Sequence, residues 1–493
     1  MGRADLERLS KDELIELVLR LQHPEKTSRT SSKPPSTDRK ERREQARPGG
    51  AKPGHEGHSR TLAQDPDRVI EHRPACCPDC GLVLPPDLPA ETVSTHEHIE
   101  LPPVRPVVEQ HRRLAVTCPA CQARVAAPRP AGAASTPFGA RLHATAVYLK
   151  CFQALSYERL QRALSDLFGL TISQGGLMAM LRRAQTRFAP GREAALSALR
   201  RAAVVACDET GVRIEGSNSY HWVFRCDDAV VHHAAPTRAG SVVREIMGGH
   251  RPAVWLSDRY SAQQGHADRQ QTCLAHLARD VAYALEAGDD PVAFRLKLWL
   301  GSAFALARGI GSLAASTINA KRRKLEAALD EILAAPVTCD LARDIQTRMR
   351  RARDQVLTFA SFPGRVEATN NACERDLRPA VIQRKNTNGY RAMWSAQGEA
   401  AVRTVVATAR LKAGPSTFGT VLSTITAGPL PIASFYPLGN YLGPGEYVVN
   451  VSVMSEGGYD GEPAYYTANR DILDFHTRAY TLKNRSSLAR ERI

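Results

Sequence analysis

The chain has 493 residues, 43% of them hydrophobic, and a formal net charge of +15. This length exceeds what one hydrophobic core usually supports, so we expect two to four domains. Because no apolar run is long enough to cross a bilayer and the charged N-terminus lacks the apolar stretch of a signal peptide, we expect a cytoplasmic protein without a membrane partner. The excess of basic residues favours a polyanionic partner.

The first 62 residues predict a short helix followed by a flexible linker. Within residues 1–22, five leucines lie roughly on one face of a helix: Leu6, Leu9, Leu14, Leu17 and Leu21. Such a face either packs against the body of the protein or mediates self-association, because so short a helix is not stable alone in water. Residues 23–62 are polar, basic and rich in Pro, Gly and Ser, so they predict either a solvated linker or an arm that binds phosphate groups.

Residues 63–130 predict a small zinc-binding domain. Four of their cysteines form two Cys-Pro-x-Cys pairs: Cys77 with Cys80, and Cys118 with Cys121. Four thiolates in two short pairs suit tetrahedral Zn²⁺, and a site closed by four sulfur ligands is structural rather than catalytic. Cys76 is an alternative to Cys77 as the ligand. An odd total of 11 cysteines without a secretion signal argues against a disulfide framework.

Residues 140–201 predict a helical region that connects to the rest of the chain or binds DNA. Within it, residues 155–181 have the pattern of two helices joined by a Gly-containing turn. This pattern is found both in helix-turn-helix motifs that read DNA and in ordinary helical pairs, and the second interpretation is favoured because such turns are common.

Residues 202–260 predict β-structure, with a hairpin around the sequence EGSNS and two further strands. Residues 267–360 predict mostly helices. Another helix is expected to begin at Asn371, and an Ala-rich helix is expected around residues 399–412.

Three acidic residues in this part of the chain are candidate metal ligands. Asp208 and Asp258 each follow an apolar run, and Glu374 lies at the start of a predicted helix. Carboxylates held on a rigid sheet can bind two divalent cations, which together promote displacement at a phosphodiester. Each residue also has a simpler interpretation: the two aspartates can start turns, and Asn371 with Glu374 has the spacing of a capping box.

The neighbourhood of Glu374 adds rivals and basic residues. Glu367 and Asp376 are alternative third carboxylates, and Pro379 is expected to kink or stop the helix. Four basic side chains in the same stretch are candidate phosphate contacts: Arg375, Arg378, Arg384 and Lys385.

Several segments of the chain resemble the IS66 family of bacterial insertion-sequence transposases. They are DETGVRI with the hairpin SNSYHWVFRC, then LSDRYSAQQGH with CLAHLARD, then EATNNACERDLRPAVIQRKN. The resemblance runs from about SSKPPSTD to about TFGTVLSTI. It implies an α/β fold with a ribonuclease H-like catalytic core over residues 202–427, a helical insertion at about residues 285–360, a preceding zinc-binding domain and an N-terminal helix.

The resemblance also implies roles for individual residues. The first Asp on the first strand, the second after the fourth strand and a Glu on a later helix would be Asp208, Asp258 and Glu374, which would bind Mg²⁺ or Mn²⁺. Glu374 is preferred over its rivals because it matches the acidic position of the family's NNxxER pattern. His276 matches the family's Cys-x-Ala-His word and would contact DNA or metal.

The implied function is DNA transposition. The protein would bind the terminal inverted repeats of its insertion sequence as a homo-oligomer, cleave the ends and join them to target DNA by a two-metal mechanism, in the bacterial cytoplasm at the nucleoid. Accessory proteins of the same element are candidate partners. A catalytically inactive zinc-dependent DNA-binding protein derived from a transposase, and a structure-specific nuclease, are the alternatives.

The tail of residues 428–493 is rich in Tyr and Gly and departs from the family's usual ending. A small β-rich module, an appendage of one lineage, and translation past a disrupted gene end are the interpretations that the sequence leaves open.

Overall fold

The computed structural model forms two compact units, residues 39–107 and residues 1–38 with 108–493, and each is described by itself. The described residues are a few between 10 and 15, the backbone of three strands in the tail, and residues 54–57, 60–128, 136–288, 290–412 and 414–427. The predicted helix of residues 1–22 and much of the predicted linker therefore lie outside the described residues. Within the described part of the chain, no helix is both long and apolar enough to cross a membrane.

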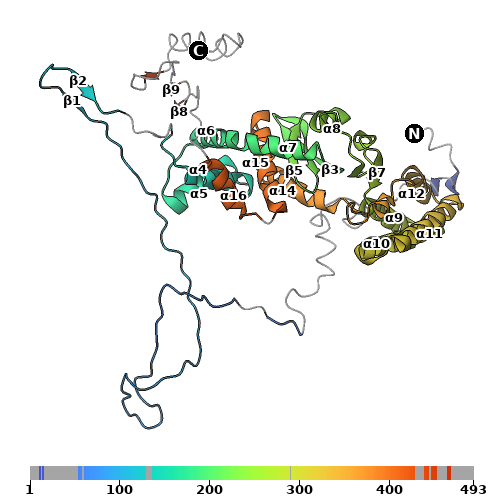
Figure 1. Cartoon of the computed structure of the whole chain (residues 1–493), viewed down its shortest axis with the longest axis horizontal. Helices are drawn as coiled ribbons and strands as arrows, with labels where there is room; N and C mark the ends of the chain where they lie inside the picture. The colour runs from blue at the N-terminus through green and yellow to red at the C-terminus, as the bar shows by residue number, and fades with distance from the viewer. Residues whose placement is uncertain are drawn as a thin grey trace. The chain divides into compact units, whose positions relative to one another are not determined.

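A five-stranded mixed sheet organises the larger unit (Figure 1). Its strands, in the order β5-β4-β3-β6-β7, are β3 (Val204–Ile214), β4 (Ser217–Arg225), β5 (Val230–Ala235), β6 (Val254–Ser257) and β7 (Arg269–Thr272). The strands β3, β4 and β5 pair antiparallel, whereas β3, β6 and β7 pair parallel. The predicted α/β class, the hairpin and the two further strands are confirmed, and β7 is an additional strand in a stretch that the sequence predicted to be mostly helical.

Helices cover both faces of the sheet because side chains alternate between the faces along each strand. On one face, α7 (Ala189–Leu199) and α8 (Gly240–Met247) pack against a cluster that includes Cys207, Trp222 and Trp255. On the other face, α14 (Asn371–Thr387) packs against a cluster that includes Val223 and Leu256. The sheet is thus buried on both sides, which holds its strand ends in fixed positions.

The helix α15 (Met393–Leu411) closes the exposed edge of β5 through two threonines. The Oγ1 of Thr404 accepts a hydrogen bond from the backbone N–H of His232 at 2.9 Å, and the Oγ1 of Thr408 accepts one from Val230 N–H at 3.1 Å. Four residues of helix rise about 6.0 Å and two residues of strand about 6.6 Å, so this spacing matches the strand's free N–H groups. The edge is thereby protected from pairing with another chain.

A buried ion pair on α15 connects this helix to the helical region before the sheet. Arg403 and Glu399 each have a side-chain exposure of 2% and lie 2.5 Å apart, and Arg403 also donates to the carbonyl of Cys151 at 2.6 Å. Nearby, His221 Nε2 and His232 Nδ1 lie 3.0 Å apart, and burial lowers the pKa of His221 to about 3. The core between α15 and the sheet therefore contains polar side chains, and each of these is paired with a particular neighbour.

The region before the sheet is helical, as predicted. Its helices α4 (Ala140–Cys151), α5 (Tyr157–Phe168) and α6 (Gln174–Gln185) share one core with α16 (Thr417–Thr426). Gly169 ends α5 in the left-handed conformation, and Ser173 caps α6. The helical pair of residues 155–181 is confirmed, and its apolar faces pack inside the protein's own core.

Five helices follow β7 and build a second core at one end of the unit (Figure 1). They are α9 (Leu274–Ala287), α10 (Pro291–Gly309), α11 (Ala315–Ala334), α12 (Asp340–Arg351) and α13 (Thr358–Ser361). The buried carboxylate of Asp290 caps α10 at Val292 N–H and accepts from the hydroxyl of Thr338, which fixes the approach to α12. In the tail, β8 (Leu438–Gly443), β9 (Glu446–Val451) and β10 (Ala464–Thr467) form a three-stranded antiparallel sheet, in agreement with the β-rich interpretation.

The threonines of α15 lead to a stability prediction. Thr404→Val keeps the side-chain volume but leaves the buried His232 N–H without an acceptor, so we expect a loss of about 1–3 kcal/mol in the free energy of unfolding. Urea denaturation followed by tryptophan fluorescence measures it. In the control Thr145→Val, the lost hydroxyl bonds only a carbonyl of its own helix, and we expect a change below about 0.5 kcal/mol. Equal losses in the two variants would contradict the edge-closing role of Thr404.

Candidate metal centre

The parallel register of the sheet brings Asp208 and Asp258 to neighbouring positions. Ala206 on β3 lies opposite Leu256 on β6, and each aspartate follows two residues further along its strand. Adjacent strands are about 4.8 Å apart, so two side chains at matched positions lie close together. The same register continues into β7, where Ser257 lies opposite Thr272 and Cys273 N–H donates to the Ser257 carbonyl at 2.9 Å.

Asn370 places Glu374 beside this strand edge. Its side-chain amide donates to the carbonyl of Cys207 on β3 at 2.8 Å, and its backbone N–H donates to the Sγ of Cys273 at 3.1 Å. Glu374 follows one helical turn later, with its N–H bonded to the Asn370 carbonyl at 3.0 Å. The predicted capping box is wrong, because α14 is capped at Asn370 rather than Asn371, and the Asn370 side chain bonds β3 instead of its own helix.

The carboxyl groups of the site repel one another. Loss of solvent around Asp208 raises its pKa well above the usual range, and the charges of Glu209, Glu374 and Asp258 raise it further. A carboxyl group in such surroundings favours either a proton or a nearby cation over the bare anion. Either a proton or a cation bound nearby would relieve this repulsion.

His276 and Arg279, in the first two turns of α9, face the same carboxylate. His276 Nδ1 lies 3.7 Å from one oxygen of Glu374, and Arg279 Nη2 lies 3.7 Å from the other. Burial lowers the pKa of His276, although the charge of Glu374 opposes this. Within the described residues, three buried polar atoms around the site have no hydrogen-bond partner: His276 Nδ1, Glu374 Oε1 and Asn370 Oδ1. These atoms offer lone pairs, so the donor set fits a divalent cation.

A second network, which sequence reasoning missed, holds the loop that contains Asp258. Glu209 follows Asp208 but points to the opposite face of the sheet, where its side chain is 1% exposed and pairs with Arg238. The buried Gln263 also donates to Glu209. Arg238 lies over the ring of Tyr260, 3.7 Å from its centroid, and Tyr260 N–H donates to Asp258 Oδ1 at 2.8 Å. Adjacent residues of β3 thus contribute one candidate ligand and one anchor for the other.

The rivals of Glu374 are placed elsewhere. Asp376 forms an ion pair with Arg225 on β4, and Glu367 is exposed before the helix begins. The prediction that Pro379 kinks or stops the helix is wrong in so far as α14 continues to Thr387, because the packing of Cys373 and Leu377 on the sheet outweighs the missing N–H.

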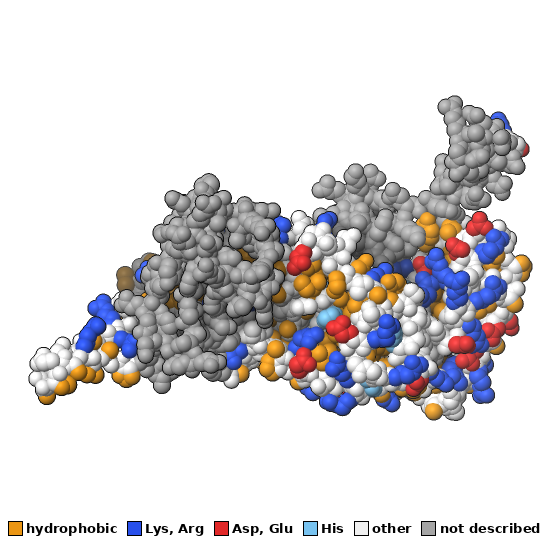
Figure 2. All heavy atoms as spheres, turned by 90° about the horizontal axis from the view of Figure 1, so that it is seen from above, with side chains coloured by type: hydrophobic (Ala, Val, Ile, Leu, Met, Phe, Trp, Pro, Cys, Tyr) orange, Lys and Arg blue, Asp and Glu red, His pale blue; other side chains and the backbone are white. Residues whose placement is uncertain are grey.

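The four basic candidates on α14 divide into two kinds. Arg375, Arg378 and Lys385 are exposed, whereas Arg384 donates to the hydroxyl of Thr210 at 2.8 Å and to the carbonyl of Gly211. Arg384 therefore joins α14 to β3. Basic side chains are spread over the face of the protein seen in Figure 2, with acidic side chains between them.

Each Cys-Pro-x-Cys pair forms the same turn, here called a cysteine knuckle. Cys77 N–H donates to the Leu82 carbonyl at 2.9 Å, and Cys118 N–H donates to the Ala123 carbonyl at 2.8 Å. In both knuckles the residue four positions on donates back to the first cysteine's carbonyl at 2.9 Å. Strands β1 (Ala115–Thr117) and β2 (Arg124–Ala126) flank the second knuckle.

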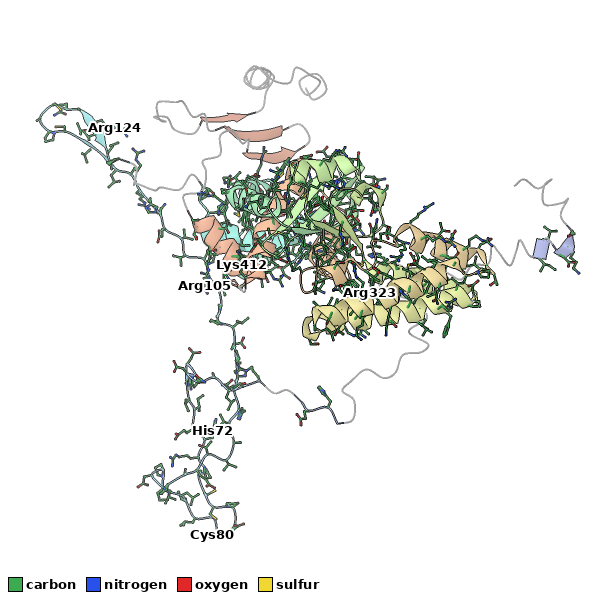
Figure 3. The ribbon with its side chains drawn as sticks, turned by 45° about the vertical axis from the view of Figure 1, so that its right-hand side comes forward. His72, Cys80, Arg105, Arg124, Arg323 and Lys412 are labelled. Carbon is green, nitrogen blue, oxygen red and sulfur yellow. The ribbon has the colours of Figure 1, made fainter. Side chains whose placement is uncertain are left out.

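The two knuckles also share their electrostatics. Backbone N–H groups of Cys80 and Asp79 lower the pKa of Cys77, and those of Cys121 and Ala120 lower the pKa of Cys118 in the same way. The first knuckle belongs to the smaller unit and the second to the larger one; Figure 3 marks Cys80 in the first knuckle and Arg124 on β2, which follows the second. In each knuckle, the backbone hydrogen bonds therefore favour the thiolate form of the first cysteine, which is the form that binds metals.

Comparisons with known proteins agree with these features. The family model "Transposase IS66 family" matches residues 135–398, which include all three carboxylates, and the model "zinc-finger binding domain of transposase IS66" matches residues 74–122, which include both knuckles. The chain belongs to the IS66 transposase family. No curated protein matches the chain.

The knuckle hydrogen bonds lead to a prediction about thiol reactivity. Because they lower the pKa of Cys77 and Cys118, these residues hold more thiolate at neutral pH, and in chelator-treated protein we expect both to react with iodoacetamide at least about threefold faster than Cys76 at pH 7. The difference should shrink as the pH rises and other exposed thiols ionise. Peptide mass spectrometry measures the rates. Buried Cys207, whose pKa burial raises, is the unreactive control, and equal rates for Cys76 and Cys77 at pH 7 would contradict the prediction.

Proposed function

We propose that the protein is a transposase with a ribonuclease H-like catalytic domain over residues 202–427, which cleaves the ends of its insertion sequence and joins them to target DNA. The observation that supports this proposal is the matched position of Asp208 and Asp258 on two parallel strands, together with the electrostatic effect of Asp258 and Glu374 on Asp208. The strand order and directions of the sheet support the ribonuclease H-like assignment, and the five helices after β7 correspond to the proposed insertion.

In this proposal the three carboxylates hold two divalent cations, Mg²⁺ or Mn²⁺. When bound, such a pair activates the attacking oxygen and stabilises the leaving oxygen of a phosphodiester. Water is the nucleophile for cleavage, and the freed 3′-hydroxyl is the nucleophile for joining. Asp208 on the central strand has little freedom to move, while Asp258 is held through the Tyr260 and Glu209 network, so the ligands are ordered before DNA arrives.

Exposed basic residues of α14 would hold the DNA next to the carboxylates. Arg375 and Arg378 lie within about one turn of Glu374, and Lys385 lies near the C-terminal end of the helix, so all three are positioned for phosphate contacts. Arg384 supports the site indirectly through its bonds to β3. Binding of the terminal inverted repeats as a homo-oligomer, at the nucleoid and with accessory proteins of the same element, belongs to this proposal and rests on the family.

The two knuckles would together bind one structural Zn²⁺ through Cys77, Cys80, Cys118 and Cys121. The matching hydrogen bonds of the knuckles support Cys77 as the ligand rather than Cys76, whose backbone instead pairs with Val83. The zinc-binding domain over residues 63–130 would present basic groups to the DNA of the element's ends.

Strand transfer by purified protein tests the proposed chemistry. With Mg²⁺ or Mn²⁺ and duplexes taken from the DNA that flanks its reading frame, the unmodified protein should yield joined products. Loss of an outer contact to a metal ligand costs about 10–100-fold, so we expect Asp258→Asn and Glu374→Gln, which remove ligands, to lose more than about 100-fold. The exposed Glu367→Gln is the matched control and should stay within about twofold. Cleavage without joining would support a nuclease instead, and zinc-dependent binding without chemistry would indicate an inactive DNA-binding derivative.

Metal analysis tests the zinc site separately from DNA chemistry. By inductively coupled plasma mass spectrometry we expect about one zinc per chain. Cys77→Ser and Cys118→Ser should each lose most of this zinc, because three sulfur ligands do not complete the tetrahedral coordination of the ion. Cys76→Ser should keep its zinc. The opposite result, with zinc retained in Cys77→Ser and lost in Cys76→Ser, would reassign the ligand.

A further inference from the structure

Three neighbouring parallel strands bring the ring of His276 close to the candidate carboxylates. Asp208 lies within β3, two residues beyond the last residue that pairs with β6, whereas Asp258 directly follows β6 and Cys273 directly follows β7 at the start of α9. His276 lies one helical turn beyond Cys273, so both side chains lie on the same side of α9. The Sγ of Cys273, a ring nitrogen of His276 and a carboxylate oxygen of Glu374 all lie within 4.8 Å of one another, and this is the one such group of three His, Cys, Asp or Glu residues in the described part of the chain.

The spacing of two of these atoms suits a shared metal ion. His276 Nδ1 and Glu374 Oε1 are 3.7 Å apart, beyond hydrogen-bond distance, and neither of these buried atoms has a hydrogen-bond partner among the described residues. Two donors bonded to one ion at about 2.1 Å, with an angle of about 90–120° between them, lie about 3.0–3.6 Å apart. A small movement of either side chain would therefore allow both atoms to bind the same ion.

The other groups around Glu374 do not occupy the space between its Oε1 atom and His276 Nδ1, and a cation suits that space. Arg279 faces the second oxygen, Oε2, so the two oxygens of the carboxylate have different neighbours. The sulfur of Cys273 is buried and already accepts a hydrogen bond from the backbone N–H of Asn370 at 3.1 Å. It therefore lines the space between His276 and Glu374 and is not counted as a metal ligand. A phosphate oxygen is unsuited to this position, because it would meet the lone pairs of Glu374 Oε1.

We propose that His276 Nδ1 and Glu374 Oε1 bind the same divalent ion, so that one of the two metal positions of the proposed transposase has a mixed nitrogen and oxygen ligand set and favours Mn²⁺ over Mg²⁺. Imidazole suits transition metals, whereas Mg²⁺ prefers oxygen ligands, and this difference is the source of the preference. The inference rests on the proposed function, because it assigns a further ligand to its metal centre. Of the two roles that the resemblance implied for His276, contact to DNA or contact to metal, it selects the contact to metal.

Pulsed electron paramagnetic resonance on the full, zinc-loaded, untagged protein tests the ligand directly. With one equivalent of Mn²⁺, the echo envelope of the unmodified protein should show a ¹⁴N modulation, which changes to a ¹⁵N pattern when the histidines are ¹⁵N-labelled. The modulation should disappear in His276→Gln, with at least about tenfold weaker Mn²⁺ binding and Mg²⁺ binding within about twofold. The labelled unmodified protein keeps the test valid even if this variant folds poorly.

The matched control is His266→Gln. His266 lies near Asp258 in sequence, but its Nε2 bonds the Ala262 carbonyl and its ring packs on Trp255, so the modulation should persist. Mn²⁺ that binds tightly and is lost in Asp258→Asn, but shows no histidine nitrogen, would overturn this inference and leave the proposed function intact. Absence of both Mn²⁺ binding and strand transfer would overturn the two together.

Discussion

The parallel pairing of β3 with β6 is the constraint on which the candidate centre depends. Its register sets Ala206 opposite Leu256, and both strands then continue into an aspartate, so the separation of the two carboxylates follows from the backbone hydrogen bonds. A slip of one residue would move one of the carboxylates to the other face of the sheet. The buried faces prevent such a slip, because Trp222 and Trp255 fill one side and α14 covers the other.

Crowding acidic side chains at one strand edge opposes folding, and the surrounding structure offsets it through specific pairs. Burial raises the pKa of Glu209, but Arg238 opposes this and holds the residue as its ion-pair partner. Arg238 in turn covers Tyr260, which orders the Asp258 loop. No comparable cation pairs with Asp208 in the described interactions, and the charges of Glu209, Glu374 and Asp258 add to the effect of burial in raising its pKa. In the proposed function, a divalent ion bound by these carboxylates would relieve that repulsion.

The two kinds of site in this chain depend on different ranges of structure. A cysteine knuckle is local, since its hydrogen bonds connect residues within five or six positions, and both knuckles form without support from a large core. The carboxylate centre is assembled over long separations: Asn370 reaches Cys207 across 163 residues. The knuckles therefore need little buried core, whereas the candidate carboxylate centre needs the sheet and the helices that cover both of its faces.

The sequence by itself determined the features that need only short spacing and residue type. These are the two cysteine pairs, the α/β class, the hairpin, most of the helices and the family. Only the tertiary structure decided the choices that depend on distant partners. Asn370 rather than Asn371 caps α14 because β3 offers its side chain a carbonyl, and Arg384 is bonded to β3 rather than exposed. Likewise, β7 forms because β6 pairs with it, and α14 passes through Pro379 because the sheet buries its other residues.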